Sequence, residues 1–480
     1  MKNKIKETVL CRMGRVNDSA FRQSYHLMAD IGWISDPNGF CVHNGVVHIF
    51  HQYTPAEDLK LHKSWGHWTT TDWHHFKDEG TLMCPDSWMD KDGCYSGSGY
   101  SRNGLLHLFY TGNVLEEGDH DYIYEGRGHY VCHRASADGI HFSQKECLLK
   151  NEAYPANMSC HVRDPKVADT QGITTMVLGA RTKDDRGCAL LYKADESDPT
   201  RMAFMQVIDS DKRFGYMWEC PDLFELDGKL YLLCCPQGVK TQGHNYENVY
   251  QNGVFAIEGD LEGGNLEARD FQELDRGFDF YAPQTMLDEK GRRILLGWVG
   301  MPDAEYTYPE KEDLWIHCLT LPRQLTRKND QVYMRPIDEV YEQIRGRKKL
   351  ELKENQPETL ESPVFYLKLD IASKPFAISV RNDADIVWDG SVLTLRMNES
   401  GAGRSERHID LSDMRTLEIF SDVSSLELFV DEGRYAMTTR VYDAGKPLML
   451  MAERGMSAEI GSVEPYSYDY SAVLGDKAED

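Results

Sequence analysis

Turn dipeptides between short apolar runs recur along this chain, and they restrict its fold more than any other feature. Asn-Gly and Asp-Gly are strong hairpin signals in such a setting, because both turn residues must tolerate a positive φ. The pattern predicts an all-β chain that is mostly strand up to about residue 335. The dipeptides are Asn44-Gly45, Asn103-Gly104 and Asp227-Gly228.

These hairpins belong to a larger repeat, in which a segment with a short motif, a turn and a strongly apolar strand follow one another. Successive repeats start at intervals of roughly 55 to 70 residues, which is long for a solenoid but fits four-stranded propeller blades with generous loops. Five repeats predict a five-bladed β-propeller. The first strand of each blade lines the central channel, so we expect equivalent positions of different blades to converge. The repeats start at Asp36, Tyr95, Asp164, Glu219 and Ala282.

Three of the repeats carry an acidic residue one or two positions ahead of a proline, in Asp36-Pro37, Asp164-Pro165 and Glu219-Cys220-Pro221. Proline removes a backbone donor and disfavours the helical region for its predecessor, so we expect each carboxylate on a stiff, extended backbone. Any one of these acids alone could be an ordinary turn residue. Together they can supply the acid, the nucleophile and the sugar-gripping group that hydrolysis of a glycosidic bond uses.

The pattern changes from about residue 336. Residues 337–345 have a helical spacing of apolar side chains, and a basic segment follows. Short alternating strands then return, which predict a β-sandwich. We expect no catalytic residue in this part. The predicted divisions are a catalytic propeller over residues 1–335, a linker with a short helix over 336–349 and a β-sandwich over 350–480.

Charge and composition limit which partners the protein can bind and in which cellular compartment it is expected. A formal charge of −25 over 480 residues argues against nucleic acid or an anionic membrane surface, because both need a basic face. No segment approaches the ~20 apolar residues of a membrane span, and we identify no secretory signal at the N-terminus. The twelve cysteines are irregularly spaced, which predicts reduced thiols in the cytoplasm.

Neither the cysteines nor the histidines predict a metal site, and we expect no cofactor. The chain has no C-x-x-C pair, and the side chains of Cys234 and Cys235 should point to opposite faces of a strand. A histidine cluster lies among tryptophans in a strand-like stretch, where packing explains it more simply than metal ligation does. Its members are His62, His67, His74 and His75.

Three segments carry a family resemblance: WISDPNG at 33–39, RDP at 163–165 and ECPD at 219–222. Together they resemble the signature set of glycoside hydrolase family 32, the β-fructofuranosidases, and the sequence around Glu219 is most similar to bacterial sucrose and sucrose-6-phosphate hydrolases. The resemblance implies a five-bladed propeller followed by a β-sandwich. It also implies a small-molecule sugar as the partner, with retaining hydrolysis of the terminal β-D-fructofuranosyl bond of sucrose, sucrose 6-phosphate or short fructo-oligosaccharides.

The resemblance gives each acid a role. Asp36 matches the nucleophile, Glu219 matches the general acid and base, and Asp164 matches the acid that stabilises the transition state. We expect Arg163 to keep Asp164 ionised, and we expect burial and neighbouring carboxylates to raise the pKa of Glu219. Retention predicts a separation of about 5 to 5.5 Å between the carboxyl groups of the nucleophile and the acid.

Further residues match positions that line the fructose pocket of the family. The family usually has Asn where this chain has Ser35, so a direct contact to the fructose should become water-mediated. Trp298 fits the core of a blade equally well. The expected substrate-binding residues are Ser35, Asn38, Gln52, Trp65, Ser96, Arg163, Tyr281 and Trp298.

Other functions use the same motifs. An exo-acting fructan hydrolase would carry the same three acids but is usually exported. A non-catalytic sugar-binding propeller would be expected to have lost at least one acid, and none is lost here. Transfer of the fructosyl group to a sugar instead of water stays open, as do the choice between sucrose and sucrose 6-phosphate and the oligomeric state.

Overall fold

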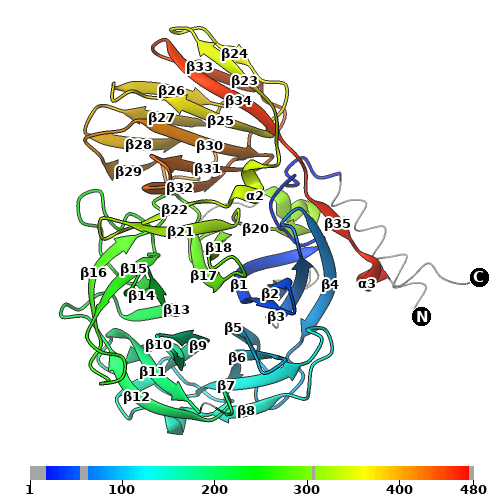
Figure 1. Cartoon of the computed structure of the whole chain (residues 1–480), viewed down its shortest axis with the longest axis vertical. Helices are drawn as coiled ribbons and strands as arrows, with labels where there is room; N and C mark the ends of the chain where they lie inside the picture. The colour runs from blue at the N-terminus through cyan, green and yellow to red at the C-terminus, as the bar shows by residue number, and fades with distance from the viewer. Residues whose placement is uncertain (1–17, 55–62, 196, 305–308, 475–480) are drawn as a thin grey trace, which may run out of the picture.

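The computed structural model describes residues 18–54, 63–195, 197–304 and 309–474, and most of its regular elements are strands. Five sheets surround a common axis, and two further sheets stack on each other beside this ring (Figure 1). The structure therefore confirms the predicted all-β fold, a propeller followed by a sandwich.

Each of the five sheets around the axis is built from four antiparallel strands that follow one another outward. The innermost strands β1, β5, β9, β13 and β17 contact one another in a ring. The strands, sheet by sheet, are β1 (Gly32–His43), β2 (Val46–Thr54), β3 (Ser64–Thr70) and β4 (His75–Met83); β5 (Cys94–Arg102), β6 (Leu105–Leu115), β7 (Arg127–Ser136) and β8 (Glu146–Leu149); β9 (Met158–Thr170), β10 (Ile173–Thr182), β11 (Gly187–Ala194) and β12 (Met202–Ile208); β13 (Met217–Leu226), β14 (Lys229–Gln237), β15 (Gly253–Glu258) and β16 (Glu267–Glu273); and β17 (Tyr281–Leu287), β18 (Arg293–Val299), β21 (Arg323–Lys328) and β22 (Gln331–Pro336).

Short elements extend two of these sheets. β19 (Trp315–Ile316) pairs in parallel with the inner edge of β1, and β35 (Ser467–Asp469) pairs in parallel with the outer strand β4. β20 (Cys318–Leu319) pairs with β18. The C-terminal part of the chain thus returns to the first blade of the propeller. Short helical turns occur at η1 (Asn151–Ala153), η2 (Pro309–Asp313) and α3 (Ser471–Leu474).

The predicted hairpin dipeptides occupy the turns between the first two strands of three blades. Asn44-Gly45 joins β1 to β2, Asn103-Gly104 joins β5 to β6, and Asp227-Gly228 joins β13 to β14. All six residues have positive φ, from 48° at Asp227 to 77° at Gly45. Both central positions therefore adopt the conformation that favours Asn, Asp and Gly, which is why these short sequences specify the hairpins.

The second unit is a sandwich of two six-stranded sheets that enclose a core of hydrophobic side chains. Alternate residues point into this core, as in β26, where Phe376, Ile378 and Val380 are buried. The strands of one sheet are β23 (Ile344–Leu352), β34 (Met456–Val463), β25 (Phe365–Asp370), β30 (Thr416–Asp422), β31 (Ser425–Val430) and β32 (Tyr435–Arg440); those of the other are β24 (Glu358–Thr359), β33 (Met449–Ala452), β26 (Phe376–Val380), β27 (Ala384–Trp388), β28 (Val392–Met397) and β29 (Glu406–Asp410).

The segment between the two units contains less helix than its spacing predicts. Helix α2 covers only Asp338–Tyr341, and strand β23 already begins at Ile344 and pairs with β34 of the sandwich. The pairing of this basic segment with β34 favours strand over helix, because tertiary hydrogen bonds override a weak local helical pattern.

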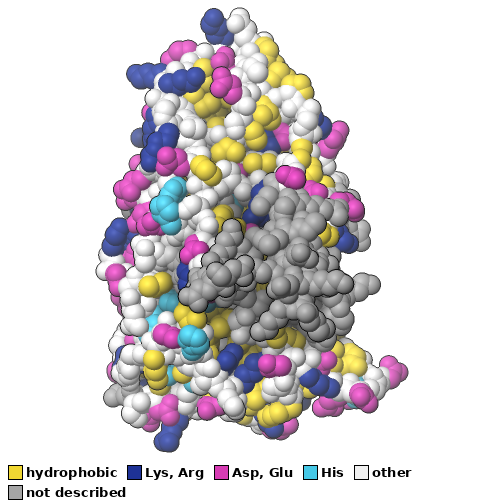
Figure 2. Space-filling view, turned by 90° about the vertical axis from the view of Figure 1, so that its right-hand side faces the viewer, with side chains coloured by type: hydrophobic (Ala, Val, Ile, Leu, Met, Phe, Trp, Pro, Cys, Tyr) yellow, Lys and Arg dark blue, Asp and Glu magenta, His cyan; other side chains and the backbone are white. Residues whose placement is uncertain are grey.

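On the face shown in Figure 2, acidic and basic side chains are mixed over both units rather than gathered into one basic area. None of the helices in the described ranges has the length and the apolar run that a membrane crossing requires. The described residues also contain no group of three or more His, Cys, Asp or Glu that could hold a metal ion.

Of the predicted histidine cluster, His62 lies outside the described residues, whereas His67 is buried in β3. The His67 ring stacks on Phe50 with a centroid distance of 4.0 Å, and its Nε2 lies 3.0 Å from Nδ1 of His48. Burial lowers the pKa of His67 well below its usual value. Packing therefore accounts for this histidine.

Candidate active site

The three predicted acids lie at irregularities of the innermost strands, where the pairing register with the next strand shifts. The shifts fall between Ile34 and Pro37 in β1, between Arg163 and Lys166 in β9, and between Glu219 and Asp222 in β13. Each shift includes a proline, which has no N–H to contribute to the ladder and is tolerated at such bulges. Bulges of this kind change the direction of the side chains that they carry.

The expectation of an extended backbone is wrong for Asp164. Its φ is 62°, and Cys220, which precedes the proline of the third motif, has a φ of 48°. The left-handed conformation arises because a bulge inserts an extra residue into the strand. The Asp164 N–H donates a hydrogen bond to Thr111 Oγ1 at 2.8 Å, and this contact from the neighbouring blade holds the bulge in place.

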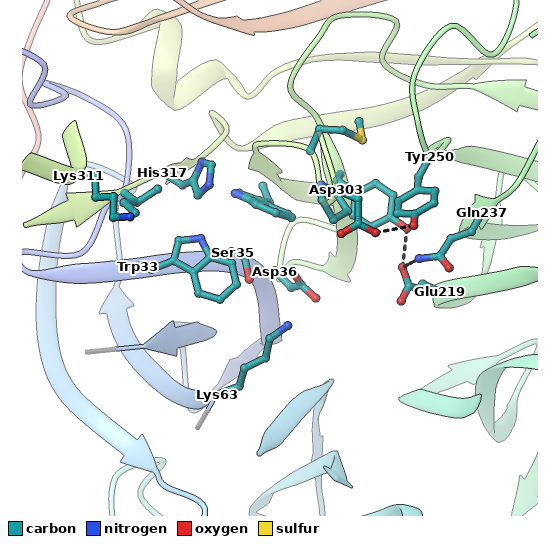
Figure 3. A pocket seen from close by; sticks show the side chains of 15 residues that line it. Trp33, Ser35, Asp36, Lys63, Glu219, Gln237, Tyr250, Asp303, Lys311 and His317 are labelled. Atoms are coloured by element: carbon teal, nitrogen blue, oxygen red, sulfur yellow. Dashed lines mark hydrogen bonds between the residues drawn. The ribbon is translucent and has the colours of Figure 1, made fainter. Parts of the chain in front are cut away.

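Two adjacent cavities open where the acids meet. One has a volume of about 520 Å³ and the other about 120 Å³. Asp36, Glu219 and Lys63 border both cavities, whereas Asp164 borders only the smaller one. Figure 3 shows the carboxylates of Asp36 and Glu219 facing each other across the larger cavity. All three acids therefore surround the smaller cavity, and two of them also face the larger one.

Hydrogen bonds orient Asp36 and Asp164. The Ser96 hydroxyl donates to Asp36 Oδ2 at 2.6 Å, and the Cys220 N–H donates to Asp164 Oδ2 at 3.0 Å. The Asp164 side chain is only 5% exposed. Burial raises the pKa of Asp164 to about 7, and the carboxylate of Glu219 adds to the rise although the Arg163 guanidinium opposes it. A carboxyl that titrates near neutrality thus lies beside the other two acids.

Glu219 is the most strongly hydrogen-bonded of the three acids. Arg163 donates to its Oε1 from two nitrogens, Nε at 3.2 Å and Nη2. Oε2 accepts from Gln237 at 2.7 Å and from the Tyr281 hydroxyl at 2.5 Å. Burial acts to raise the pKa of Glu219, but the charge of Arg163 and these hydrogen bonds outweigh burial, and the pKa is lowered. The predicted rise is therefore wrong.

Arg163 also differs from its expected role as the partner of Asp164. Its guanidinium binds Glu219 directly, whereas its Nε lies 4.0 Å from Asp164 Oδ2. The side chain of Glu219 reaches from the next blade to this arginine, and sequence neighbours on one strand point in different directions. Arg163 therefore stabilises the ionised form of Glu219 more than that of Asp164.

The other predicted residues divide between the cavities and the core. Ser35, Tyr281 and Trp298 border the larger cavity, and Gln52, Ser96 and Arg163 border the smaller one. Two residues border neither in the described part of the chain. These are Asn38, which is fully buried in β1, and Trp65, whose indole N–H donates to the Tyr95 carbonyl at 3.1 Å.

Several cavity residues lie outside the sequence motifs. Gln237 could have been found by counting outward from the Asp227-Gly228 turn, since it pairs with Met217 beside Glu219. The remaining residues lie in other strands and in loops that carry no comparable signal. They are Lys63, Tyr250, Met301, Pro302, Asp303, Lys311, Ile316 and His317 in the larger cavity, and Arg127, His129 and His161 in the smaller one.

Comparison with known proteins gives a consistent result. The model described as "Glycosyl hydrolases family 32 N-terminal domain" matches residues 26–336, and the model "Glycosyl hydrolases family 32 C terminal" matches residues 338–467. A sucrose-6-phosphate hydrolase of Bacillus subtilis is 37% identical over 446 residues, which cover 89% of this chain and 90% of that protein. A raffinose invertase of Escherichia coli is 34% identical over 450 residues, 90% and 92% of the two chains. The solved sucrose-6-phosphate hydrolase of Lactobacillus gasseri superposes with a TM-score of 0.86 at 26% identity, covering 96% of each chain.

Proposed function

The chain belongs to glycosyl hydrolase family 32, and from this premise we propose that it is a retaining β-fructofuranosidase acting on sucrose or a close derivative of sucrose. One observation carries the proposal: Asp36, Asp164 and Glu219 surround one small cavity that adjoins a larger one. Three carboxyl groups around one sugar-sized space, with room beside it for a leaving group, suit cleavage of a glycosidic bond. The names of the two relatives described above indicate that they act on sucrose-type sugars, and this supports the proposed substrate class.

The cavities suggest where the two halves of the substrate bind. The fructosyl ring would occupy the smaller cavity, because only there can all three acids contact one sugar. The leaving group would lie in the larger cavity, which Asp36 and Glu219 border. This arrangement puts the scissile bond between the carboxylates of Asp36 and Glu219.

In the first step, a carboxylate oxygen of Asp36 attacks the anomeric carbon of the fructosyl unit. The bond to the bridging oxygen breaks, and Glu219 gives its proton to that oxygen as the leaving sugar departs. Ser96 holds one oxygen of Asp36, so the other oxygen is available for the attack. Asp164 accepts hydrogen bonds from ring hydroxyls and stabilises the positive charge that develops on the ring.

In the second step, Glu219 removes a proton from water, and the hydroxide oxygen attacks the same carbon and releases Asp36. Two inversions give net retention. Glu219 must be protonated for the first step, although Arg163 favours its ionised form. Substrate entry excludes water from the cavity, and the resulting desolvation raises the pKa of a carboxyl.

We place the catalytic unit at residues 1–335, the linker at 336–349 and the sandwich at 350–480, with the first sandwich strand, β23, beginning at Ile344 inside the linker segment. The two family models meet at the same segment, since the first ends at residue 336 and the second begins at 338. A cytoplasmic location belongs to this proposal as well. It is supported by the eleven cysteines of the described ranges, all of which are free thiols.

A proton NMR time course with sucrose tests the proposal directly. We expect β-fructofuranose as the first fructose product, followed by slow mutarotation, because the double displacement retains configuration. Release of α-fructose first would exclude the covalent mechanism. Complete absence of sucrose and sucrose 6-phosphate hydrolysis would exclude the proposed function.

A further inference from the structure

His161 borders the smaller cavity, and both of its ring nitrogens have fixed partners. It lies on β9 two residues before Arg163, so the two side chains emerge on the same face of the strand. Nδ1 lies 2.7 Å from Nη1 of Arg163, and Nε2 lies 3.1 Å from the Tyr122 carbonyl oxygen. Neither nitrogen is therefore left for a sugar hydroxyl.

These two partners allow only one protonation state of the ring. The Arg163 guanidinium can only donate, so Nδ1 must carry a lone pair and accept. The Tyr122 carbonyl can only accept, so Nε2 must carry the proton. Burial, together with the charges of Arg163 and Arg127, lowers the pKa of His161 to about 3. The ring is therefore neutral at physiological pH, with its proton on Nε2.

The contact with His161 completes the hydrogen bonding of Arg163. A guanidinium is a planar fork, and Arg163 directs Nε and Nη2 at Glu219 Oε1 while Nη1 donates to the histidine. Because the group is planar, fixing Nη1 also fixes the plane in which the other two nitrogens meet the carboxylate. The second oxygen of Glu219 is held separately, by Gln237 and Tyr281.

Arg163 has a second acid within reach. Its Nε lies 4.0 Å from Asp164 Oδ2, so a rotation of the guanidinium would exchange one carboxylate for the other. Such a rotation would take Nη1 away from His161, and a buried donor without an acceptor is costly. The histidine therefore favours the orientation in which Arg163 binds Glu219.

The backbone around Tyr122 gives the histidine a fixed support. This segment joins β6 to β7, and the φ of Tyr122 is 56°. The Asp121 carboxylate accepts hydrogen bonds from the N–H groups of Ile123 at 2.9 Å and Tyr124 at 2.8 Å. The Cys160 N–H donates to the Ile123 carbonyl at 2.8 Å. A connection of the second blade thus holds a side chain of the third.

We propose that His161 is a positioning residue, which holds the Arg163 guanidinium against Glu219 for proton transfer to the leaving oxygen. The inference rests on the proposed function, because it assumes that Glu219 is the general acid and base. When Glu219 gives up its proton, its negative charge appears beside a guanidinium that is already aligned. No reorientation is then needed at the moment of reaction, which is how a fixed donor lowers the barrier.

Charged and titratable groups from four strands surround the pair of His161 and Arg163. The His129 ring lies edge-on to His161 with a centroid distance of 5.5 Å, and burial lowers its pKa well below the usual value. Both histidines are therefore neutral between pH 5 and 8, and the carboxyl groups account for titration near neutrality. The surrounding groups are Asp164 on β9, Arg127 and His129 on β7, Arg181 on β10 and Glu219 on β13.

Two amide substitutions separate the two nitrogens of the ring. In His161→Asn the amide oxygen can replace Nδ1 and accept from Arg163, but the side chain is too short to reach the Tyr122 carbonyl. In His161→Gln the amide can replace Nε2 and donate to that carbonyl, but Nη1 of Arg163 loses its acceptor. We expect kcat for sucrose to fall about tenfold in His161→Gln with little change in KM, and to stay within about twofold of the wild type in His161→Asn.

The pH profile provides a readout that a purely structural role would not change. The basic limb of kcat/KM reports loss of the Glu219 proton in the free enzyme. Arg163 lowers the pKa of Glu219, so a guanidinium that is no longer held should move this limb to higher pH. We expect a shift of about half a pH unit or more in His161→Gln and none in His161→Asn.

His133→Gln is the matched control. His133 is also a buried histidine, its Nε2 lies 3.0 Å from Nδ1 of His107, and in the described part of the chain it borders neither cavity. This variant should lower the midpoint of thermal unfolding but leave the basic limb unchanged. In an Arg163→Met background, His161→Gln should cause no further loss of kcat, because no guanidinium is left to position.

The outcomes separate the inference from the proposed function. If His161→Gln keeps the wild-type kcat and basic limb, or if His161→Asn is impaired as much as His161→Gln, the positioning role is wrong and the hydrolase proposal stands. If His161→Gln does not fold, His161→Asn decides alone: wild-type kcat and basic limb support the role, and a loss of about tenfold or more overturns it. If the wild type hydrolyses neither sucrose nor sucrose 6-phosphate, the proposed function fails, and the inference fails with it.

Discussion

The propeller pocket and the interface between propeller and sandwich both bury acidic side chains beside arginine, but among the described residues only the interface gives every one of its acids named below a cation in contact. At the interface Arg323 binds Asp275 at 2.9 Å and Glu427 at 2.8 Å. The ring nitrogens of His26 lie 2.8 Å from Asp422 and 3.0 Å from Glu427. All these side chains are 0% exposed, and every carboxylate has a cationic partner.

The pocket contains three carboxylates but only one arginine in direct contact with any of them. Arg163 binds Glu219, whereas the contact of Asp36 is with the Ser96 hydroxyl. The pKa values of the buried acids differ accordingly. Burial raises the pKa of Asp164 to about 7, whereas at the interface Arg323 and His26 outweigh burial and lower the pKa of Glu427.

The comparison shows how one set of residue types serves two purposes. Matched buried charges fix the position of the sandwich on the propeller, and removing one partner leaves a charge without compensation. Unmatched carboxylates around a cavity destabilise the fold but keep protons available for chemistry. We therefore expect substitutions in the pocket to change rate, and substitutions at the interface to change stability.

The largest effect should come from Glu219→Gln. Glutamine keeps the shape of the side chain but can neither give a proton to the leaving oxygen nor activate water, so kcat for sucrose should fall by about 10⁴-fold. The variant should still fold, but its midpoint of thermal unfolding should decrease, because Arg163 loses its buried carboxylate partner. Steady-state kinetics and calorimetry measure the two quantities, with Glu427→Gln as the control at the interface. A Glu219→Gln enzyme with most of the wild-type kcat would remove Glu219 from its proposed role.

For Arg323→Met we expect a large loss of stability and little change in kcat. Loss of this guanidinium leaves Asp275 and Glu427 buried without their main cation, which should lower the free energy of unfolding by about 3 to 5 kcal/mol. Urea denaturation followed by tryptophan fluorescence measures the loss. The kcat of the folded fraction should stay within about twofold of the wild type. Unchanged stability together with reduced kcat would contradict the division between the two regions.

The interface should also weaken in alkali, because burial of His26 is outweighed by Asp422 and Glu427 and its pKa is raised to about 9 from 6.5. A raised histidine pKa contributes stability that is fully present below pH 6.5 and is lost as pH rises through 9, by about 3 kcal/mol in total. Denaturation curves between pH 6 and 10 measure this slope. His26→Gln should flatten it, and an equally steep slope in the variant would assign the titration to another group.

Much of the architecture follows from local signals in the sequence. The hairpin dipeptides specify turns whose residues need positive φ, and the motif around Asp36 and Pro37 consists of neighbouring residues, so a local pattern identifies it. The convergence of Asp36, Asp164 and Glu219 on one cavity could be predicted because the propeller repeats the same strand in each blade.

Contacts between blades were less predictable. The choice of Glu219 over Asp164 as the partner of Arg163 depends on side-chain directions across two strands, which no local pattern contains. The lowered pKa of Glu219 follows from that same pairing. Residues such as Lys63 and Lys311 lie in segments without a motif, and only the folded chain brings them to the cavity.

The smallest and most diagnostic effect is expected for Asp164→Asn, which should stabilise the fold while reducing activity. Because the pKa of Asp164 is raised to about 7 in the folded protein, ionising this carboxyl lowers the free energy of unfolding. The loss is complete above pH 7 and disappears as pH falls toward 4. Asparagine removes the charge but still buries polar atoms, so we expect a gain of about 2 kcal/mol at pH 8 and none at pH 4. Urea denaturation at both pH values measures it. A loss of stability at pH 8 would mean that Asp164 is compensated like the interface acids, and the contrast between the two regions would then not hold.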